Sequence, residues 1–298
     1  MTQIALNLTG VHELGSGFDT LMAAARLADE RGIDQVTIAD HLGMNADAYA
    51  AKLTTGSNFP FAIDFAYYEP IATLSAIAAV TQRIRLSMNV LVAPLRPAIL
   101  LAKQLATLDV ISKGRLDAAF GVGWQEAEYT ASNIPFQGRY TDLEEQIEVC
   151  RALWGGAPAS YSGRRVTFRD FYSLPLPVQA GGIPVWIGLP ASERNVERIG
   201  RLGNAWCPVP VAPDVLASGV KAIKDSMRRH GRDPSSLQVR GCIIPVKRSD
   251  GSVDLDASLA QIPALEKAGA TIVHLYLYYY CKRWDDLGTI VEKLLKYK

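Results

Sequence analysis

Residues 83–126 constrain the fold most, because they form a complete strand–helix–strand unit. Residues 84–92 are rich in β-branched and apolar side chains without the polar alternation of a one-faced strand, which predicts a strand covered on both faces of a parallel sheet. Residues 98–112 repeat apolar side chains at helical spacing. A second strand, 116–120, then runs into a glycine-containing turn that ends at Glu126. The unit is therefore predicted to be a right-handed parallel crossover.

The rest of the chain repeats this alternation of strand and helix. Strands are predicted at residues 3–8, 35–39, 84–92, 116–120, 184–188, 204–207, 237–246 and 271–277. Helices are predicted at residues 18–31, 69–82, 98–112, 139–154, 192–202, 213–230, 255–268 and 285–295. Eight alternating strands predict an α/β fold of the (β/α)8 TIM-barrel type, spanning residues 1–298 as a single domain. Residues 155–182, with a hairpin-like stretch at 161–168, are interpreted as an insertion between strands four and five.

The alternative architecture is a doubly wound sheet that binds a dinucleotide. The turn Gly121-Val122-Gly123 follows a strand, as such a fingerprint requires. However, Glu126 stands where the third glycine belongs, and the unit lies in the middle of the chain. The barrel is therefore the favoured fold.

Charge and cysteine spacing exclude several classes of function. The formal charge of +1 gives no global field that would attract nucleic acid or an anionic membrane. Four cysteines (150, 207, 242 and 281) lie far apart, without zinc-ligand spacing, so we expect reduced, buried thiols and no metal site. The first residues lack the pattern of a signal peptide, and the apolar run at 71–80 is too short to span a bilayer. We expect a soluble, cytoplasmic protein.

Polar residues at the carboxyl ends of the predicted strands are the candidates for catalysis, because active sites of barrels lie at that end. They are Asn7, Asp40, His41, Asn89 and Glu126. Asp40 could orient the imidazole of His41 and make it a proton donor; alternatively, His41 bonds to a backbone carbonyl and Asp40 caps a helix. Glu126 is either a base near a ligand or a first-turn acid that complements a helix dipole.

Residues 188–193 leave strand five and enter a helix. Free backbone N–H groups at such a helix start can bind a phosphate, and Ser192 could add its hydroxyl. The alternative is an ordinary helix that Ser192 caps.

Three stretches together resemble the bacterial-luciferase-like family of oxidoreductases, which are barrels that use flavin mononucleotide (FMN) or the deazaflavin coenzyme F420. They are Asp40-His41-Leu42, residues 69–129 and residues 183–206. Within this family, the chain looks most like the F420-dependent branch.

The resemblance implies roles for individual residues. Asp40 and His41 would lie beside the cofactor, with His41 as proton donor or stabiliser, and Glu126 would act as acid or base. A non-proline cis peptide near Asn89-Val90 would back the ring. Further cofactor contacts would come from Gly123, Tyr129, Gly188, Leu189, Pro190, Ala191 and Ser192, with the phosphate near 190–192, although family members often have glycines at positions 189–191.

The implied activity is hydride transfer between F420 and a small organic substrate. The alternatives are an FMN-dependent two-component monooxygenase, supplied by a flavin or F420 reductase partner, and a flavin-binding barrel without turnover. The loop 43–67, the insertion near 161–171 and the tyrosine-rich run 276–280 are expected to line or cover the pocket. The alternative for the tyrosines is packing at a strand edge. The chain has no evident cluster of lysines for a phosphorylated sugar, and Lys221 and Lys282 are no more than candidates, so specificity for glucose-6-phosphate is not supported.

A homodimer is also expected. Ile71, Leu74, Ile77 and Ala78, beside the helix at 98–111, could form an apolar dimer face. The alternative is that these side chains pack on the barrel.

Overall fold

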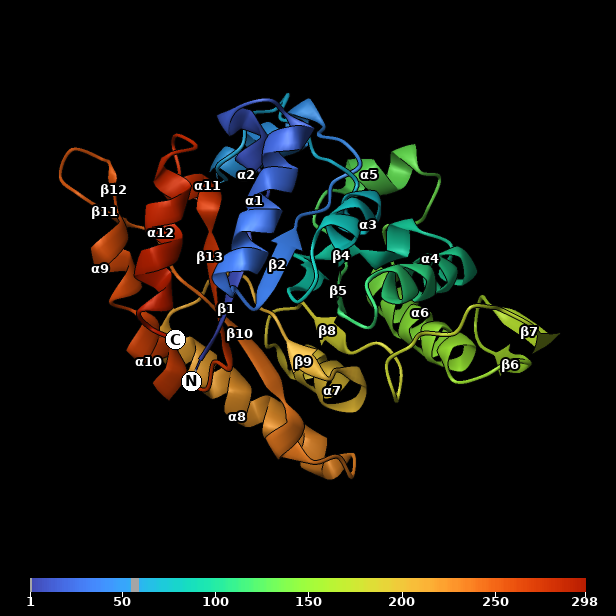
Figure 1. Cartoon of the computed structure of the whole chain (residues 1–298). Helices are drawn as coiled ribbons and strands as arrows, with labels where there is room; N and C mark the ends of the chain where they lie inside the picture. Colours follow the sequence, from blue (N-terminus) through green and yellow to red (C-terminus); the bar gives the residue numbers. More distant parts are fainter. Residues whose placement is uncertain (1, 55–58) are drawn as a thin grey trace.

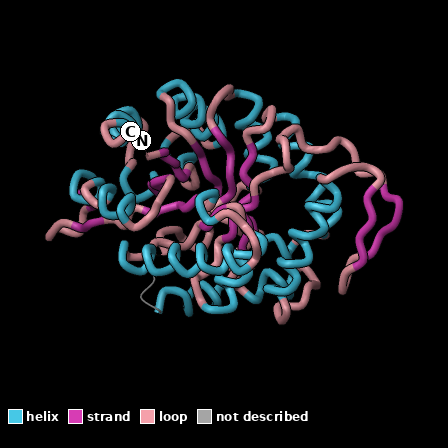
Figure 2. Tube along the Cα trace, turned by 90° about the horizontal axis from the view of Figure 1, so that it is seen from below, coloured by secondary structure: helices cyan, strands magenta, loops and turns pink. Residues whose placement is uncertain are grey.

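Eight parallel strands form a closed barrel in the computed structural model, which describes residues 2–54 and 59–298. The strands are β1 (Gln3–Asn7), β2 (Gln35–Ile38), β3 (Arg85–Met88), β5 (Leu116–Gly121), β8 (Val185–Ile187), β9 (Ala205–Trp206), β10 (Gln238–Cys242) and β13 (Ile272–Tyr276). Their order is β3-β2-β1-β13-β10-β9-β8-β5, and β5 pairs back with β3 through Leu86 and Leu116. Figure 2 shows these strands at the centre, surrounded by helices. The predicted (β/α)8 barrel is confirmed.

The outer layer consists of helices that follow the strands (Figure 1). They are α1 (Phe18–Arg31), α3 (Pro70–Val80), α4 (Ala98–Ile111), α6 (Arg139–Trp154), α7 (Glu193–Leu202), α8 (Pro213–Arg229), α10 (Ile262–Lys267) and α12 (Asp286–Leu295). Local chemistry sets their ends. Gly32 ends α1 in the left-handed conformation at φ 83°, and Pro70 opens α3 beneath a Glu69 cap on Ala72 N–H.

Several shorter elements refine the predicted boundaries. They are α2 (Ala46–Thr54), α5 (Glu126–Ala131), α9 (Leu255–Leu259), α11 (Leu277–Tyr280), β4 (Leu91–Val92), β11 (Val246–Lys247), β12 (Val253–Asp254), and 3-10 turns at Val11–Leu14, Ala93–Leu95 and Pro234–Ser236. The predicted loop 43–67 contains α2, while residues 55–58 of that loop lie outside the described part. The helix predicted at 255–268 is two helices, since Pro263 has no N–H to continue α9. The strand predicted at 237–246 ends at Cys242.

The insertion between α6 and β8 carries an antiparallel hairpin of β6 (Ala159–Ser162) and β7 (Thr167–Phe171), in which Tyr161 pairs with Phe168. The hairpin predicted at 161–168 is confirmed. Figures 1 and 2 show it projecting sideways from the barrel.

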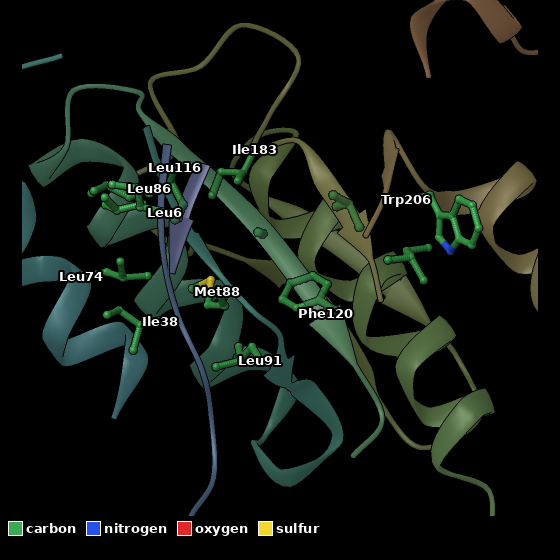
Figure 3. Packing of buried hydrophobic residues seen from close by; sticks show 14 of the residues in the cluster. Leu6, Ile38, Leu74, Leu86, Met88, Leu91, Leu116, Phe120, Ile183 and Trp206 are labelled. Carbon is green, nitrogen blue, oxygen red and sulfur yellow. The ribbon is translucent and has the colours of Figure 1, made fainter. Parts of the chain in front are cut away.

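The segment 84–92 differs from its predicted form. Polar and apolar side chains alternate along β3: Leu86 and Met88 belong to the apolar layer beneath the helices (Figure 3), whereas Ser87 bonds to Arg240 of β10. Because β10 and β3 are not neighbours in the sheet, that contact crosses the barrel interior. The strand is also interrupted after Met88, where the peptide bond Asn89–Val90 is cis before β4 begins.

The dimer face considered for four residues of α3 is wrong, and the alternative, that they pack on the barrel, is confirmed. Ile71, Leu74, Ile77 and Ala78 are each at most 6% exposed, and they belong to the core cluster between α3 and the barrel. Burial in the protein's own core leaves them unavailable to a partner. No helix among the described residues is long and apolar enough to cross a membrane.

Candidate functional site

His41 and Glu128 form a buried pair at the carboxyl end of the barrel. His41 Nδ1 lies 3.2 Å from each carboxylate oxygen of Glu128, and the Leu42 N–H donates to the same carboxylate at 2.6 Å. The His41 side chain is 11% exposed and that of Glu128 is 3% exposed. Glu128 therefore fixes the orientation of the imidazole. The hydrogen bond between the two residues places a proton on Nδ1 of His41.

Glu128 is held ionised by its neighbours. Burial alone would raise the pKa of this carboxyl group. Hydrogen bonds from His41, Gln125 and the Leu42 N–H outweigh that effect, so the pKa of Glu128 lies below its ordinary value. An ionised carboxylate against Nδ1 leaves Nε2 as the ring atom that can exchange a proton with a ligand, since no described residue hydrogen-bonds to it.

Glu126 occupies a different position from the predicted one. It is the first residue of α5 and is exposed, and no described residue forms a hydrogen bond or an ion pair with its carboxylate. Glu126 and Glu128 are two residues apart, so the helix turns their side chains to different faces. The sequence shows both acids but not which of them points inward, and for that reason Glu128 was missed.

Asp40 does not orient His41. Its carboxylate makes a two-pronged ion pair with Arg96, with N–O distances of 2.7 and 3.0 Å, and accepts the Val92 N–H at 2.8 Å. Arg96 also pairs with Glu69 at 2.9 Å. Asp40 thus ties the end of β2 to β4, and the predicted Asp40–His41 contact and helix-cap role are both wrong.

Aromatic side chains contact the imidazole ring of His41. The ring centroids of Tyr67, Trp124 and Phe59 lie 4.9, 5.8 and 6.4 Å from that of His41. Phe61, in contact with Tyr67, packs at 4.5 Å against Tyr278 of the predicted tyrosine run. The loop after β2 and the segment after β13 therefore build one aromatic wall.

A cavity of about 300 Å³ borders Glu128. It is lined by residues 42–45 and by α5, including Glu128. Gln125 keeps the loop in place: its side chain accepts from Asn45 N–H at 2.6 Å and donates to the Gly43 carbonyl at 2.8 Å. A cavity of this size matches a small organic ligand.

The cis peptide expected near Asn89–Val90 is confirmed. Asn89 donates from Nδ2 to the Tyr276 hydroxyl at 2.9 Å, and its Oδ1 accepts from Arg240 at 3.3 Å. Val90 lies between two glycines: a Cβ at Gly121 or at Gly188 would come within 2.5 or 2.6 Å of its methyl groups. The missing side chains let three strand ends converge on Val90.

Gly123 and Tyr129 shape the turn after β5. Gly123 has φ +64°, and a Cβ there would lie 2.8 Å from Val92. Tyr129 is 1% exposed and donates its hydroxyl to the Val122 carbonyl at 2.6 Å. The Tyr129 side chain therefore has a structural role in this turn, in which its hydroxyl is already bonded.

The predicted phosphate segment is only partly open. Leu189 is buried, and its carbonyl accepts from Trp206 Nε1 at 2.9 Å. The Pro190 carbonyl accepts from Ser192 N–H and from Asn195 Nδ2. Ala191 and Ser192 are exposed, and the Ser192 hydroxyl makes no capping bond at the start of α7.

The remaining candidates lie apart from one another. Asn7 is buried and joins β1 to β2 through a 3.0 Å bond to Thr37. Lys282 lies at the aromatic wall, 5.1 Å from the Tyr278 ring centroid, whereas Lys221 pairs with Asp225 on the outer helix α8. These two lysines do not form a joint anion site.

Comparison with known proteins finds a matching family model and two related proteins. Residues 4–266 match the family model described as luciferase-like monooxygenase. An uncharacterized protein of Mycobacterium tuberculosis is 36% identical over 72% of this chain and 76% of its own. The phthiodiolone/phenolphthiodiolone dimycocerosates ketoreductase of the same species is 29% identical over 83% of this chain and 66% of its own.

Solved structures share the fold. The monooxygenase RslO1 of Streptomyces bottropensis superposes with a TM-score of 0.80 at 20% identity, over 99% of both chains. The coenzyme F420-dependent tetrahydromethanopterin reductase of Methanopyrus kandleri does so with a TM-score of 0.77 at 17% identity, also over 99% of both chains. One barrel thus serves both a monooxygenase and an F420-dependent reductase.

Proposed function

The chain belongs to the luciferase-like monooxygenase family, and within it we propose an oxidoreductase that transfers a hydride between coenzyme F420 and a small organic substrate. The observation that carries this proposal is the His41–Glu128 pair at the barrel mouth. Reduction of a carbonyl requires a proton as well as a hydride, and a held imidazole can supply one. The relatedness to a ketoreductase supports the same class of reaction.

The strand ends fit a flat ring system. Gly121 and Gly188 present no side chain, so Val90 forms an apolar surface between them. Asn89 and His41 supply polar groups from neighbouring strands. The N-terminus of α7, with the exposed hydroxyl of Ser192, would hold the cofactor phosphate.

The protein's own residues would position the reactants and move one proton. When bound, F420 would accept or donate the hydride. His41 would exchange its proton through Nε2, while Glu128 keeps Nδ1 protonated and stabilises the charged imidazole. Phe59, Tyr67 and Trp124 would exclude water from the substrate, which favours an apolar or ring-containing compound.

The second candidate is an FMN-dependent monooxygenase that receives reduced flavin from a reductase partner. The likeness to RslO1 favours it. A barrel that binds cofactor without turnover is the third candidate.

Titration of the purified protein with F420 and with FMN, followed by fluorescence quenching, separates these candidates. We expect saturable F420 binding, then loss or gain of F420 absorbance with a panel of ketones, enones and secondary alcohols. Binding of FMN alone would reject the F420 assignment. F420 binding without hydride exchange over the panel would favour the non-catalytic barrel.

A further inference from the structure

Arg240 is a fully buried arginine inside the barrel. It lies on β10 and is 0% exposed. Nη2 donates to Gln35 at 2.7 Å and to Ser87 at 3.2 Å, and Nη1 reaches Asn89 Oδ1 at 3.3 Å and the Met88 carbonyl at 3.4 Å. Its Nε has no hydrogen-bond partner among the described residues. The guanidinium of Arg240 therefore holds the Met88 carbonyl and the Asn89 side chain, which precede the Asn89–Val90 peptide bond.

The charge of Arg240 is not neutralised by its contacts, which are all uncharged. The carboxylate in its hydrogen-bond network is that of Asp117, which is linked to Arg240 only through Gln35. The Gln35 amide donates to Asp117 at 2.8 Å. Asp117 is already paired with Arg85 at 2.6 Å. A buried cation without an ionised partner costs free energy, and this cost points to a role for the charge.

Apart from Asp117, which is paired with Arg85, the other titratable groups inside the barrel add no negative charge. Burial raises the pKa of Cys207 to about 11 and of Cys242 to about 12, and burial also raises the pKa of Tyr276. Burial, and then the charge of Arg240, hold the pKa of His274 well below its ordinary value. These groups are neutral near pH 7, so the positive charge of Arg240 stands alone among them.

Three carboxylates at the mouth are paired with basic side chains. Asp40 and Glu69 share Arg96, and Glu128 faces His41. The uncompensated charge that lies nearest the cis peptide is thus Arg240.

From this geometry we infer that Arg240 is a positioning residue with an electrostatic role: it holds Asn89 beneath the cofactor ring, and its charge favours the anionic form of that ring. The inference rests on the proposed function. Deazaflavins and reduced flavins both carry an acidic group on the ring system, so a cation on the barrel axis would stabilise the deprotonated form of either.

Optical pH titration of bound F420 tests this role, because ionisation of the phenolic group of the deazaflavin changes its visible absorption. In Arg240→Met, we expect the titration of bound F420 to move to higher pH by about one unit, and its affinity to fall about tenfold. Arg240→Lys keeps the charge but not the fork of donors, so it should restore the titration and leave the affinity weak.

Asp117→Asn provides the matched opposite change, because it removes a negative charge and leaves Arg85 unpaired. It should move the titration to lower pH. If Arg240→Met does not fold, as judged by circular dichroism, the Asp117→Asn shift decides.

If F420 binds but its titration is unchanged in Arg240→Met, the inference is overturned and the F420 assignment stands. Where Arg240→Met does not fold, an unchanged titration in Asp117→Asn overturns the inference in the same way. Failure of the wild-type protein to bind F420 would instead remove the F420 assignment.

If FMN is the cofactor, the same variants are compared by the midpoint potential of bound FMN. Arg240→Met should lower that potential, and an equal potential would overturn the inference.

Discussion

The two faces of the barrel strands differ in chemistry. The outer face packs against the helices with apolar side chains. These include Val36 and, as labelled in Figure 3, Ile38, Leu86, Met88, Leu116 and Phe120. The inner face of the same strands carries buried polar side chains: Asn7, Gln35, Thr37, Ser87, Asp117, Arg240 and His274. Apolar burial stabilises the fold in proportion to area, whereas buried polar groups cost free energy unless they are paired.

This difference separates stability from function. The interior groups form directed chains: Asn7 donates to Thr37, which lies 2.9 Å from His274. Asn89 reaches Tyr276 at 2.9 Å. Such chains orient the groups at the mouth, so we expect substitutions on the two faces to have different consequences.

The largest expected effect falls at the mouth. His41→Asn should lower kcat for hydride transfer about 100- to 10,000-fold, because the proton donor is lost, and Glu128→Gln should lower it less. Both variants should retain the thermal unfolding midpoint to within a few degrees. Stopped-flow absorbance of F420 measures the rate, and a loss below threefold in His41→Asn would remove this residue from the mechanism.

The next effect concerns the outer face. Leu74→Ala deletes a fully buried side chain between α3 and the barrel, so the free energy of unfolding should fall by about 2–5 kcal/mol. The affinity for F420 per folded molecule should stay unchanged. Urea unfolding with a parallel binding titration checks both quantities; weaker binding at equal folded fraction would contradict the separation of the two faces.

A smaller effect concerns pH. The pKa of Glu128 is lower in the folded protein than its ordinary value of 4.5. Its ionisation therefore stabilises the fold above pH 4.5, and this contribution is lost as the pH falls through the lower folded pKa. The stability difference between wild type and Glu128→Gln should shrink below pH 4.5, as measured by urea unfolding across pH 3–7. A difference that is constant over this range would show that the charge of Glu128 contributes nothing.

The smallest effect is expected at Glu126. Because its carboxylate is exposed and forms no hydrogen bond or ion pair with a described residue, Glu126→Gln should change kcat less than twofold. It is the control for Glu128→Gln, since both variants replace an acid of α5 by its amide. An equal loss in the two variants would restore the catalytic role first expected of Glu126.

Local patterns predicted the outer layer well. α1 at 18–31 and α6 at 139–154 were predicted at their observed bounds, because apolar spacing, a glycine end and a polar face all occur within each segment. The position of the cis peptide followed from the family resemblance.

The site itself depended on contacts that no local pattern contains. His41 meets Glu128 from 87 residues away, and Asp40 meets Arg96 from 56 residues away. Adjacency in sequence instead suggested the pair Asp40–His41, which the fold separates. The polar inner face of β3 was missed because Ser87 was counted as part of an apolar run.

A crystal structure of the protein with bound F420 tests the account most directly. The ring should lie against Val90 at the carboxyl end of the barrel, with His41 Nε2 facing it and the phosphate at the start of α7. A ring bound elsewhere, or one separated from His41 by the aromatic wall, would contradict it.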